Sequence, residues 1–233
     1  MSRMEIDHLF MFIEPGGPEI DALLRLGLTE TYRRAHPGQG TANVCFAFDN
    51  LYLELLWLTS EAEARSPAIA RTRLWERSQW RTLGTCPLGI AVRGDLASAG
   101  VPTWDYRPPY LPLDMSIPVA TDSDDPMQPM LFVSPGREAP LGWPESRRSA
   151  LQSAAGFGPV LSVELALPGG AASAPLHSLV VPGNALGFAA RPDGRFGLRL
   201  LLGDRSEKRS HVLDIVSTDD GPWEVSLNEE TLH

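Results

Sequence analysis

Residues 5–14 have the sequence EIDHLFMFIE, an apolar run with a histidine in its middle. The period-two alternation of its side chains predicts a β-strand. In such a strand His8 lies on the same face as Phe10 and Phe12, and Asp7 lies on the opposite face. A histidine in this position is either a hydrogen-bonded core residue or a ligand held in an apolar cavity. For a single histidine the core role is the more common one.

The residues that follow predict a helix and three further strands. The segment GPEIDALLRLGL, residues 17–28, has apolar residues at helical spacing, a proline in its first turn and a glycine near its end. The stretches TETYRRA, TANVCFAF and LYLELLWL, at residues 29–35, 41–48 and 51–58, are expected to be strands. The order is therefore strand, helix, strand, strand, strand.

Glu54 is a second polar residue within an apolar strand. Its neighbours on the same face are Tyr52, Leu56 and Leu58. A buried, isolated carboxylate is costly, so Glu54 must pair, bind a metal or be protonated, unless it faces water from an edge strand. Imidazole and carboxylate groups are common ligands of zinc, manganese, iron and nickel ions. A histidine in the first strand and a glutamate in the last therefore indicate one shared site.

The middle of the chain is less regular. Residues 60–80 and 144–155 predict helices, and residues 86–94 predict a strand. Residues 101–137 are rich in proline and turn residues, which indicates a functional lid or a linker. This segment also contains three Trp or Tyr residues, which are unusual in disordered chains. They are Trp104, Tyr106 and Tyr110.

After residue 158 the first pattern recurs in a weaker form. The run VLSVELALPGG, residues 160–170, resembles the opening strand and its Pro-Gly-Gly ending, and three more strands can follow it. We therefore expect one compact fold with a first module at residues 1–58, inserted elements at 59–157 and a second, degenerate module at 158–233.

Aligning the two modules compares their polar positions. Asp214 falls opposite Glu54 in the closing strands. The position opposite His8 is Leu161 or Val163, depending on the register, and neither side chain can bind a metal.

The composition excludes several classes of protein. The chain has 233 residues, 43% of them hydrophobic and 21% charged, which suits a soluble globular protein. A net charge of −9 disfavours nucleic-acid binding. Two cysteines, Cys45 and Cys86, exclude a disulfide framework and a cysteine-rich zinc site. The sequence shows no secretory signal and no membrane-spanning run, so we expect a cytoplasmic protein without nucleic-acid or membrane partners.

The module with a histidine in its first strand and a glutamate in its last resembles those of the vicinal oxygen chelate superfamily. That superfamily includes glyoxalase I, bleomycin-resistance proteins and extradiol dioxygenases. The segments HPGQGTANVCFAFDNLYLELLWL (36–58), CPLGIAVRG (86–94) and PTWDYRPPYLP (102–112) are similar to its glyoxalase-like domain branch. The resemblance implies an α+β fold: paired strand-helix-three-strand modules form a curled mixed sheet around a cavity, with an inserted irregular segment.

The resemblance also implies a site. In metal-containing members, the substrate binds through two adjacent oxygens and the metal acts as a Lewis acid. His8, Glu54 and Asp214 would then be the metal ligands, and the cofactor a divalent Zn, Mn, Ni or Fe ion. With one position aliphatic, the site has three protein ligands and water, binds metal weakly or has lost it. Glu54 is also a candidate catalytic base.

Four further residues are candidates for contacts with a small-molecule substrate. Thr41 and Asn43 share a strand face, or else they cap the turn before them. Arg107 and Tyr110 lie in the proline-rich segment and would close over the pocket, with the arginine binding a carboxylate or phosphate. The alternative for Arg107 is a structural role, stacked on an aromatic ring of the loop.

Two functions from different classes are expected. One is a metal-dependent lyase, isomerase or hydrolase of glyoxalase type that acts on a small oxygen-rich molecule. The other is a metal-free protein that binds or sequesters a small molecule. His8 and Glu54 favour the enzyme, whereas the missing ligand and an acidic chain with Trp57 and Trp104 allow the binding protein. A homodimer is among the assemblies expected.

Overall fold

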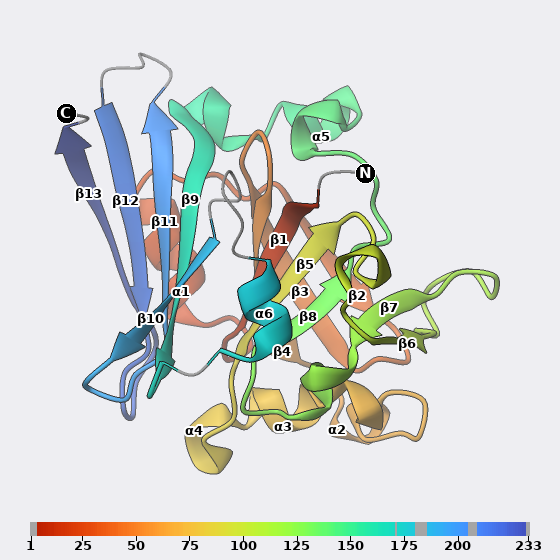
Figure 1. Ribbon diagram of the computed structural model, residues 1–233. Helices are drawn as coiled ribbons and strands as arrows, with labels where there is room; N and C mark the ends of the chain where they lie inside the picture. Colours follow the sequence, from red (N-terminus) through yellow and green to blue (C-terminus); the bar gives the residue numbers. More distant parts are fainter. Residues whose placement is uncertain (1–3, 171, 180–185, 205–208, 232–233) are drawn as a thin grey trace.

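The computed structural model describes residues 4–170, 172–179, 186–204 and 209–231. They form two β-sheets with short helices around them (Figure 1). The larger sheet has eight strands in the order β2-β3-β4-β1-β5-β8-β7-β6, and the smaller has five in the order β10-β9-β11-β12-β13. Among these residues, no helix has the length and hydropathy needed to span a membrane.

The first half of the larger sheet is the strand-helix-three-strand module expected from the sequence. It contains β1 (Glu5–Phe12), α1 (Pro18–Arg25), β2 (Tyr32–His36), β3 (Thr41–Ala47) and β4 (Tyr52–Leu58). β1 pairs with β4 in parallel, and β2, β3 and β4 pair antiparallel. Glu54 therefore lies on a central strand next to the one that carries His8, and not on an edge.

The second half of the larger sheet repeats this order. It contains β5 (Leu88–Arg93), η2 (Ala97–Ala99), β6 (Thr103–Tyr106), β7 (Ile117–Ala120) and β8 (Met130–Val133). The strand order β5-β8-β7-β6 matches β1-β4-β3-β2, with the single turn η2 in place of the helix. Antiparallel pairing of β1 with β5 joins the halves. The expected α+β fold of paired modules in a mixed sheet is confirmed.

The position of the second module corrects the expected organisation. Residues 88–133 supply it, from within the segment 59–157 that was expected to be an insert, and residues 158–231 form the smaller sheet. β6, β7 and β8 are four residues long, too short to show a clear alternation. In the smaller sheet the first strand pairs with its neighbours β10 and β11. Alternation of side chains cannot reveal that difference in pairing order.

The smaller sheet packs against the first module. It contains β9 (Phe157–Pro168), β10 (Leu186–Arg191), β11 (Gly197–Asp204), β12 (Arg209–Val216) and β13 (Glu224–Thr231), with α6 (Ala174–Ser178) between the first two. The side-chain amide of Asn50 makes two hydrogen bonds with the backbone of Val160, of 2.8 and 2.9 Å. The Trp223 indole donates to the Phe12 carbonyl oxygen at 3.0 Å. One continuous core includes residues of both sheets, so the smaller sheet supports the larger one.

The remaining helices are short. They are α2 (Glu61–Ala64), η1 (Ala70–Thr72), α3 (Leu74–Ser78), α4 (Trp80–Leu83), η3 (Thr121–Asp124), η4 (Pro140–Gly142), α5 (Glu145–Arg148) and η5 (Gln152–Ala155). The helix predicted over residues 60–80 is divided at Arg73, whose φ of 58° is left-handed and cannot continue a helix.

Candidate functional site

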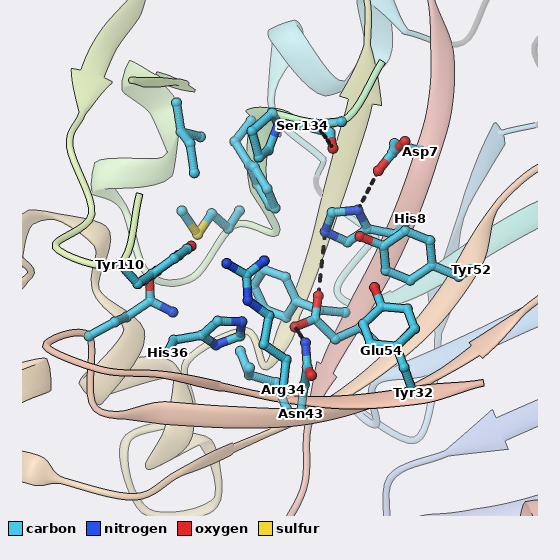
Figure 2. Close-up of a pocket in the computed structure, with 18 of the residues that line it drawn as sticks. Asp7, His8, Tyr32, Arg34, His36, Asn43, Tyr52, Glu54, Tyr110 and Ser134 are labelled. Atoms are coloured by element: carbon cyan, nitrogen blue, oxygen red, sulfur yellow. Dashed lines mark hydrogen bonds and ion pairs between the residues drawn. The ribbon is translucent and has the colours of Figure 1, made fainter. Parts of the chain in front are cut away.

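One face of the eight-stranded sheet lines a cavity of about 230 Å³ (Figure 2). Side chains from both halves of the sheet contribute to it, from β1 to β4 on one side and from β6 to β8 on the other. Phe, Tyr and Trp rings make up seven of the lining residues, and polar and charged side chains lie among them. Pockets for drug-sized ligands usually start at about 300 Å³, so this cavity suits a small molecule.

His8 and Glu54 meet inside this cavity. The Nε2 atom of His8 lies 3.4 Å from Oε2 of Glu54, and both side chains are more than nine-tenths buried. The His8 ring stacks on Tyr52 at a centroid distance of 4.4 Å, and the edge of Phe132 contacts it from the other half of the sheet. The proximity expected from the sequence is therefore observed, and the ring orientation is fixed by packing.

Asp7 joins these two residues because of an irregularity in β1. The pairing of β1 with β5 shifts between Ile6 and His8, which leaves Asp7 as the extra residue of a β-bulge. Its side chain then lines the cavity instead of the opposite face. Asp7 Oδ2 lies 2.8 Å from His8 Nδ1, and Oδ1 accepts a hydrogen bond of 2.6 Å from Arg93.

The partners of Asp7 keep it charged. Burial alone would raise the pKa of this carboxyl, but the hydrogen bond and charge of His8 lower it, with further help from Ser134 and Arg93. The net effect is a pKa below the ordinary value. Asp7 is thus a permanent acceptor for the Nδ1–H group of His8.

The hydrogen bond between Asp7 and His8 determines the state of the His8 atom that faces Glu54. With the ring proton on Nδ1, the Nε2 atom of a neutral His8 carries a lone pair directed into the cavity. Glu54 is held from its other side, where the Asn43 amide donates to Oε1 at 2.5 Å. Two acceptor atoms, Nε2 and Oε2, therefore face each other across 3.4 Å. Such a pair is stable only with a proton or a cation between them.

The distance between these two atoms fits a bound metal ion, but the number of protein ligands does not. Bonds of about 2.1 Å in a tetrahedral zinc site place neighbouring ligands about 3.4 Å apart, as observed for these two atoms. Catalytic zinc sites, however, use three protein ligands. In the described ranges, no group of three or more His, Cys, Asp or Glu side chains is arranged to hold a metal ion. The donor set of His8 and Glu54 falls short of a metal site.

The side chains of the second half of the sheet explain why, among the described residues, His8 and Glu54 have no third metal ligand beside them. Where β5 and β8 face the cavity, the lining side chains are Met130 and Phe132, which supply no oxygen or nitrogen. On β5, the ring of Phe10 occupies the space above Gly89, since a Cβ atom there would lie 2.1 Å from it. An aromatic ring thus fills the space beside β5.

Comparison with known protein families gives one match. A family model described as a glyoxalase-like domain matches residues 6–103, which run from β1 to the start of β6. Residues 6–103 are therefore similar to a glyoxalase-like domain. No curated protein matches the sequence.

Two solved structures have a distant similarity to the chain. A hypothetical protein from Staphylococcus aureus has 13% identity and a TM-score of 0.39 over 70% of both chains. A mutant of 4-hydroxymandelate synthase from Streptomyces coelicolor has 13% identity and a TM-score of 0.38, over 87% of this chain and 60% of the synthase. Similarities at this level carry nothing about the site of the glyoxalase-like domain.

Asp214 lies outside the cavity, which corrects its expected role as a third ligand. It is on β12 of the smaller sheet, opposite Arg199 in the register of β11 and β12. Its Oδ2 atom lies 3.8 Å from Arg199 Nη1, and both side chains are partly exposed. The alignment that placed Asp214 opposite Glu54 assumed the wrong second module.

We expect Asp214→Ala to change little. Exposed ion pairs contribute about 0–1 kcal/mol, so the free energy of unfolding should fall by less than about 1 kcal/mol. Ligand and metal binding in the cavity should equal those of the parent. Chemical denaturation and isothermal titration with zinc or manganese measure the two quantities. A loss of metal affinity in this variant would restore the three-ligand site.

The four expected substrate contacts divide into two groups. Asn43 and Tyr110 line the cavity. Thr41 is buried beneath it, where its hydroxyl accepts from Gln39 at 2.7 Å and lies 3.0 Å from His36 Nδ1. Arg107 does not line the cavity; its exposed guanidinium lies 3.3 Å from the Leu113 carbonyl oxygen.

Strand β2 contributes residues that the sequence reasoning missed. Tyr32, Arg34 and His36 alternate along YRRAH and all line the cavity, as Figure 2 shows. Burial lowers the pKa of His36, so this ring is neutral near pH 7. Burial also raises the pKa of Tyr32 and Tyr110, whose hydroxyls stay protonated. The alternation of these residues was the available signal, because one strand face points into the cavity.

Proposed function

We propose that this cavity is the active site of an enzyme that moves a proton on a small oxygen-rich molecule, as a lyase or isomerase of glyoxalase type. The observation that carries the proposal is the buried series Asp7–His8–Glu54, with contacts of 2.8 and 3.4 Å. Histidine and glutamate that share one proton form an acid–base pair, which is what carbon–proton transfer requires.

His8 serves as the base in this mechanism. Its Nε2 lone pair faces the cavity, and Asp7 holds the ring in that tautomer through Nδ1. When Nε2 takes a proton from the carbon next to a carbonyl group, the carboxylate of Asp7 stabilises the imidazolium that forms.

Glu54 serves as the acid. Its carboxyl group holds the proton that lies between Oε2 and Nε2. This proton passes to the carbonyl oxygen as the enol forms, which frees the Nε2 lone pair for the carbon-bound proton. The enzyme then carries the same net charge as before, because His8 has gained a proton and Glu54 has lost one. Return of the proton to a neighbouring carbon completes an isomerisation. Asn43 donates to Oε1 throughout and steadies the carboxylate.

The proposed steps do not involve a metal ion, because among the residues that the structure describes only His8 and Glu54 could act as ligands here. A divalent ion was the cofactor expected from the family resemblance, so the point needs its own measurement. Titration of chelator-treated protein with zinc and manganese should give no binding at micromolar concentrations. Stoichiometric binding that His8→Gln abolishes would return the metal to the mechanism.

A second candidate function is metal-free binding of a small molecule without turnover. The aromatic lining supports it, since the rings of Tyr32, Tyr52 and Trp143 lie within 5.6 to 6.2 Å of one another beside the cavity. Flat ligands stack well on such surfaces.

Exchange of carbon-bound protons with solvent separates the two functions. We would incubate the protein in deuterium oxide with small ketones and 2-oxo acids such as 2-oxobutanoate, and follow the α-proton signals by NMR. Exchange well above the buffer rate supports the enzyme. Binding of a compound with an acidic C–H bond, without any exchange, would identify the chain as a binding protein.

A further inference from the structure

Arg34 is a cation at the cavity with no acidic partner. It lies on β2 between Tyr32 and His36, and its guanidinium is within 5.1 Å of the ring centre of Tyr110 (Figure 2). In the part of the chain that the structure describes, this guanidinium forms no ion pair and donates no hydrogen bond. The adjacent Arg33 differs, since it donates to both oxygens of Glu30 at 2.7 and 2.8 Å.

Arg147 repeats this pattern from a different part of the chain. It belongs to α5, between the two sheets in sequence, and it also lines the cavity. Its guanidinium lies 4.7 Å from the ring centre of Tyr32 and 5.6 Å from that of Trp143. Over the described ranges it too has no ion pair, whereas the neighbouring Arg148 is paired with Glu145.

The two arginines converge on one strand face. Arg147 covers Tyr32, which is two residues from Arg34 on the cavity side of β2. The charges of both arginines also act to lower the pKa of the Cys45 thiol, which lies opposite Tyr32 in the register of β2 and β3, against the larger effect of burial, which raises it. Both side chains are exposed at the cavity, where solvent screens their repulsion, and an anion bound between them would accept charge-assisted hydrogen bonds from both.

The scarcity of acids does not explain these free cations. The chain has 29 Asp and Glu against 20 Lys and Arg, so partners are abundant. Each guanidinium instead lies over an aromatic ring, that of Tyr110 for Arg34 and that of Tyr32 for Arg147. This contact uses no conventional hydrogen-bond acceptor, so N–H groups remain available for a planar oxyanion, which arginine binds with two parallel hydrogen bonds.

We infer that Arg34 and Arg147 form a carboxylate-binding clamp, so that the substrate is a small organic acid. This inference rests on the proposed function, which identifies the end of the substrate that reacts. The ionised carboxylate of Asp7 repels a second carboxylate at this end of the cavity, so the acid group binds at the arginines. The carbon to be deprotonated then lies toward His8 and Glu54.

Isothermal titration tests the clamp with 2-oxobutanoate, its uncharged methyl ester and inorganic phosphate. The parent should bind the acid at least tenfold more tightly than the ester. Arg34→Gln and Arg147→Gln should each weaken acid binding by about 10–100-fold and leave ester binding unchanged, since charged hydrogen bonds are lost. Arg33→Gln and Arg148→Gln are matched controls, one residue away on the same elements, and should bind the acid as the parent does.

Several results would overturn the clamp. Equal affinity for acid and ester, no binding of the acid, or an equal loss in the two control variants would each do so. Phosphate that binds more tightly than the acid would make the ligand a phosphate and end the carboxylate assignment. Acid that binds as expected but exchanges no proton would leave the clamp in place and remove the proposed reaction. Ester that exchanges its protons as fast as the acid, at a rate that Arg34→Gln does not change, would remove the clamp and leave the proposed reaction in place.

Discussion

Replacing His8 with glutamine is expected to slow exchange of the substrate's α-protons by about 10²–10⁴-fold, the usual contribution of a general base. Glutamine keeps a buried polar group next to Asp7 and Glu54 but cannot accept and release a proton at Nε2. Binding of the acid at the arginines should change by less than about threefold, because His8 contacts the reacting end of the substrate. Deuterium exchange by NMR and isothermal titration, on the same preparation, measure the two effects.

Two further variants serve as a comparison and a control for His8→Gln. Glu54→Gln should slow exchange by about 10²-fold, because an amide still donates a hydrogen bond but no longer transfers a proton. His177→Gln changes an exposed histidine of α6 and should exchange at the parent rate. Exchange by His8→Gln within tenfold of the parent, at an unchanged melting temperature, would contradict the assignment of the base.

The sequence revealed His8 and Glu54 because each interrupts an apolar strand. A polar residue in a period-two apolar run is a local signal, and burial then obliges it to find a partner. The residues that complete the site carry no such signal. Arg34 and His36 lie on β2, a strand with exposed positions where charged side chains are ordinary. Only the placement of β2 within the sheet makes one of its faces the wall of a cavity.

Asp7 and the second module show what alternation cannot predict. The bulge that turns Asp7 into the cavity arises from the pairing of β1 with β5, which are 75 residues or more apart in sequence. The order of strands is likewise a property of long-range pairing. Residues 158–231 have the clearer strand patterns, yet the shorter strands of residues 88–133 complete the larger sheet. The family resemblance identified the architecture correctly, and the repeat reasoning then chose the wrong half.

Asp7→Asn is expected to slow proton exchange by about 10²–10⁴-fold, although Asp7 itself does not contact the substrate. An asparagine amide can donate to His8 Nδ1, which moves the ring proton to Nε2 and removes the lone pair from the cavity. Nitrogen NMR of the His8 ring should show the proton on Nδ1 in the parent and on Nε2 in the variant. A merely structural role for Asp7 would leave the tautomer unchanged.

Loss of stability must be separated from this effect, because Asp7 also pairs with Arg93 in a buried position. Arg93→Gln breaks the same ion pair and retains the carboxylate beside His8. Both variants should lose about 3 kcal/mol of unfolding free energy. Only Asp7→Asn should lose exchange activity and change the tautomer. Equal exchange rates in the two variants would show that Asp7 acts through stability alone.

The pH dependence of stability gives an independent check on the charge of Asp7. Its pKa is lower in the folded protein than in the unfolded chain, where it is about 3.9. The stabilisation it provides is therefore complete above about pH 5 and is lost as the pH falls through the folded value. The difference in unfolding free energy between the parent and Asp7→Asn should stay constant from about pH 5 to pH 8 and narrow below about pH 4. A difference that stayed constant below about pH 4 would mean that the partners of Asp7 do not favour its ionised form. Asp7 could then not be the permanent acceptor that holds the proton of His8 on Nδ1.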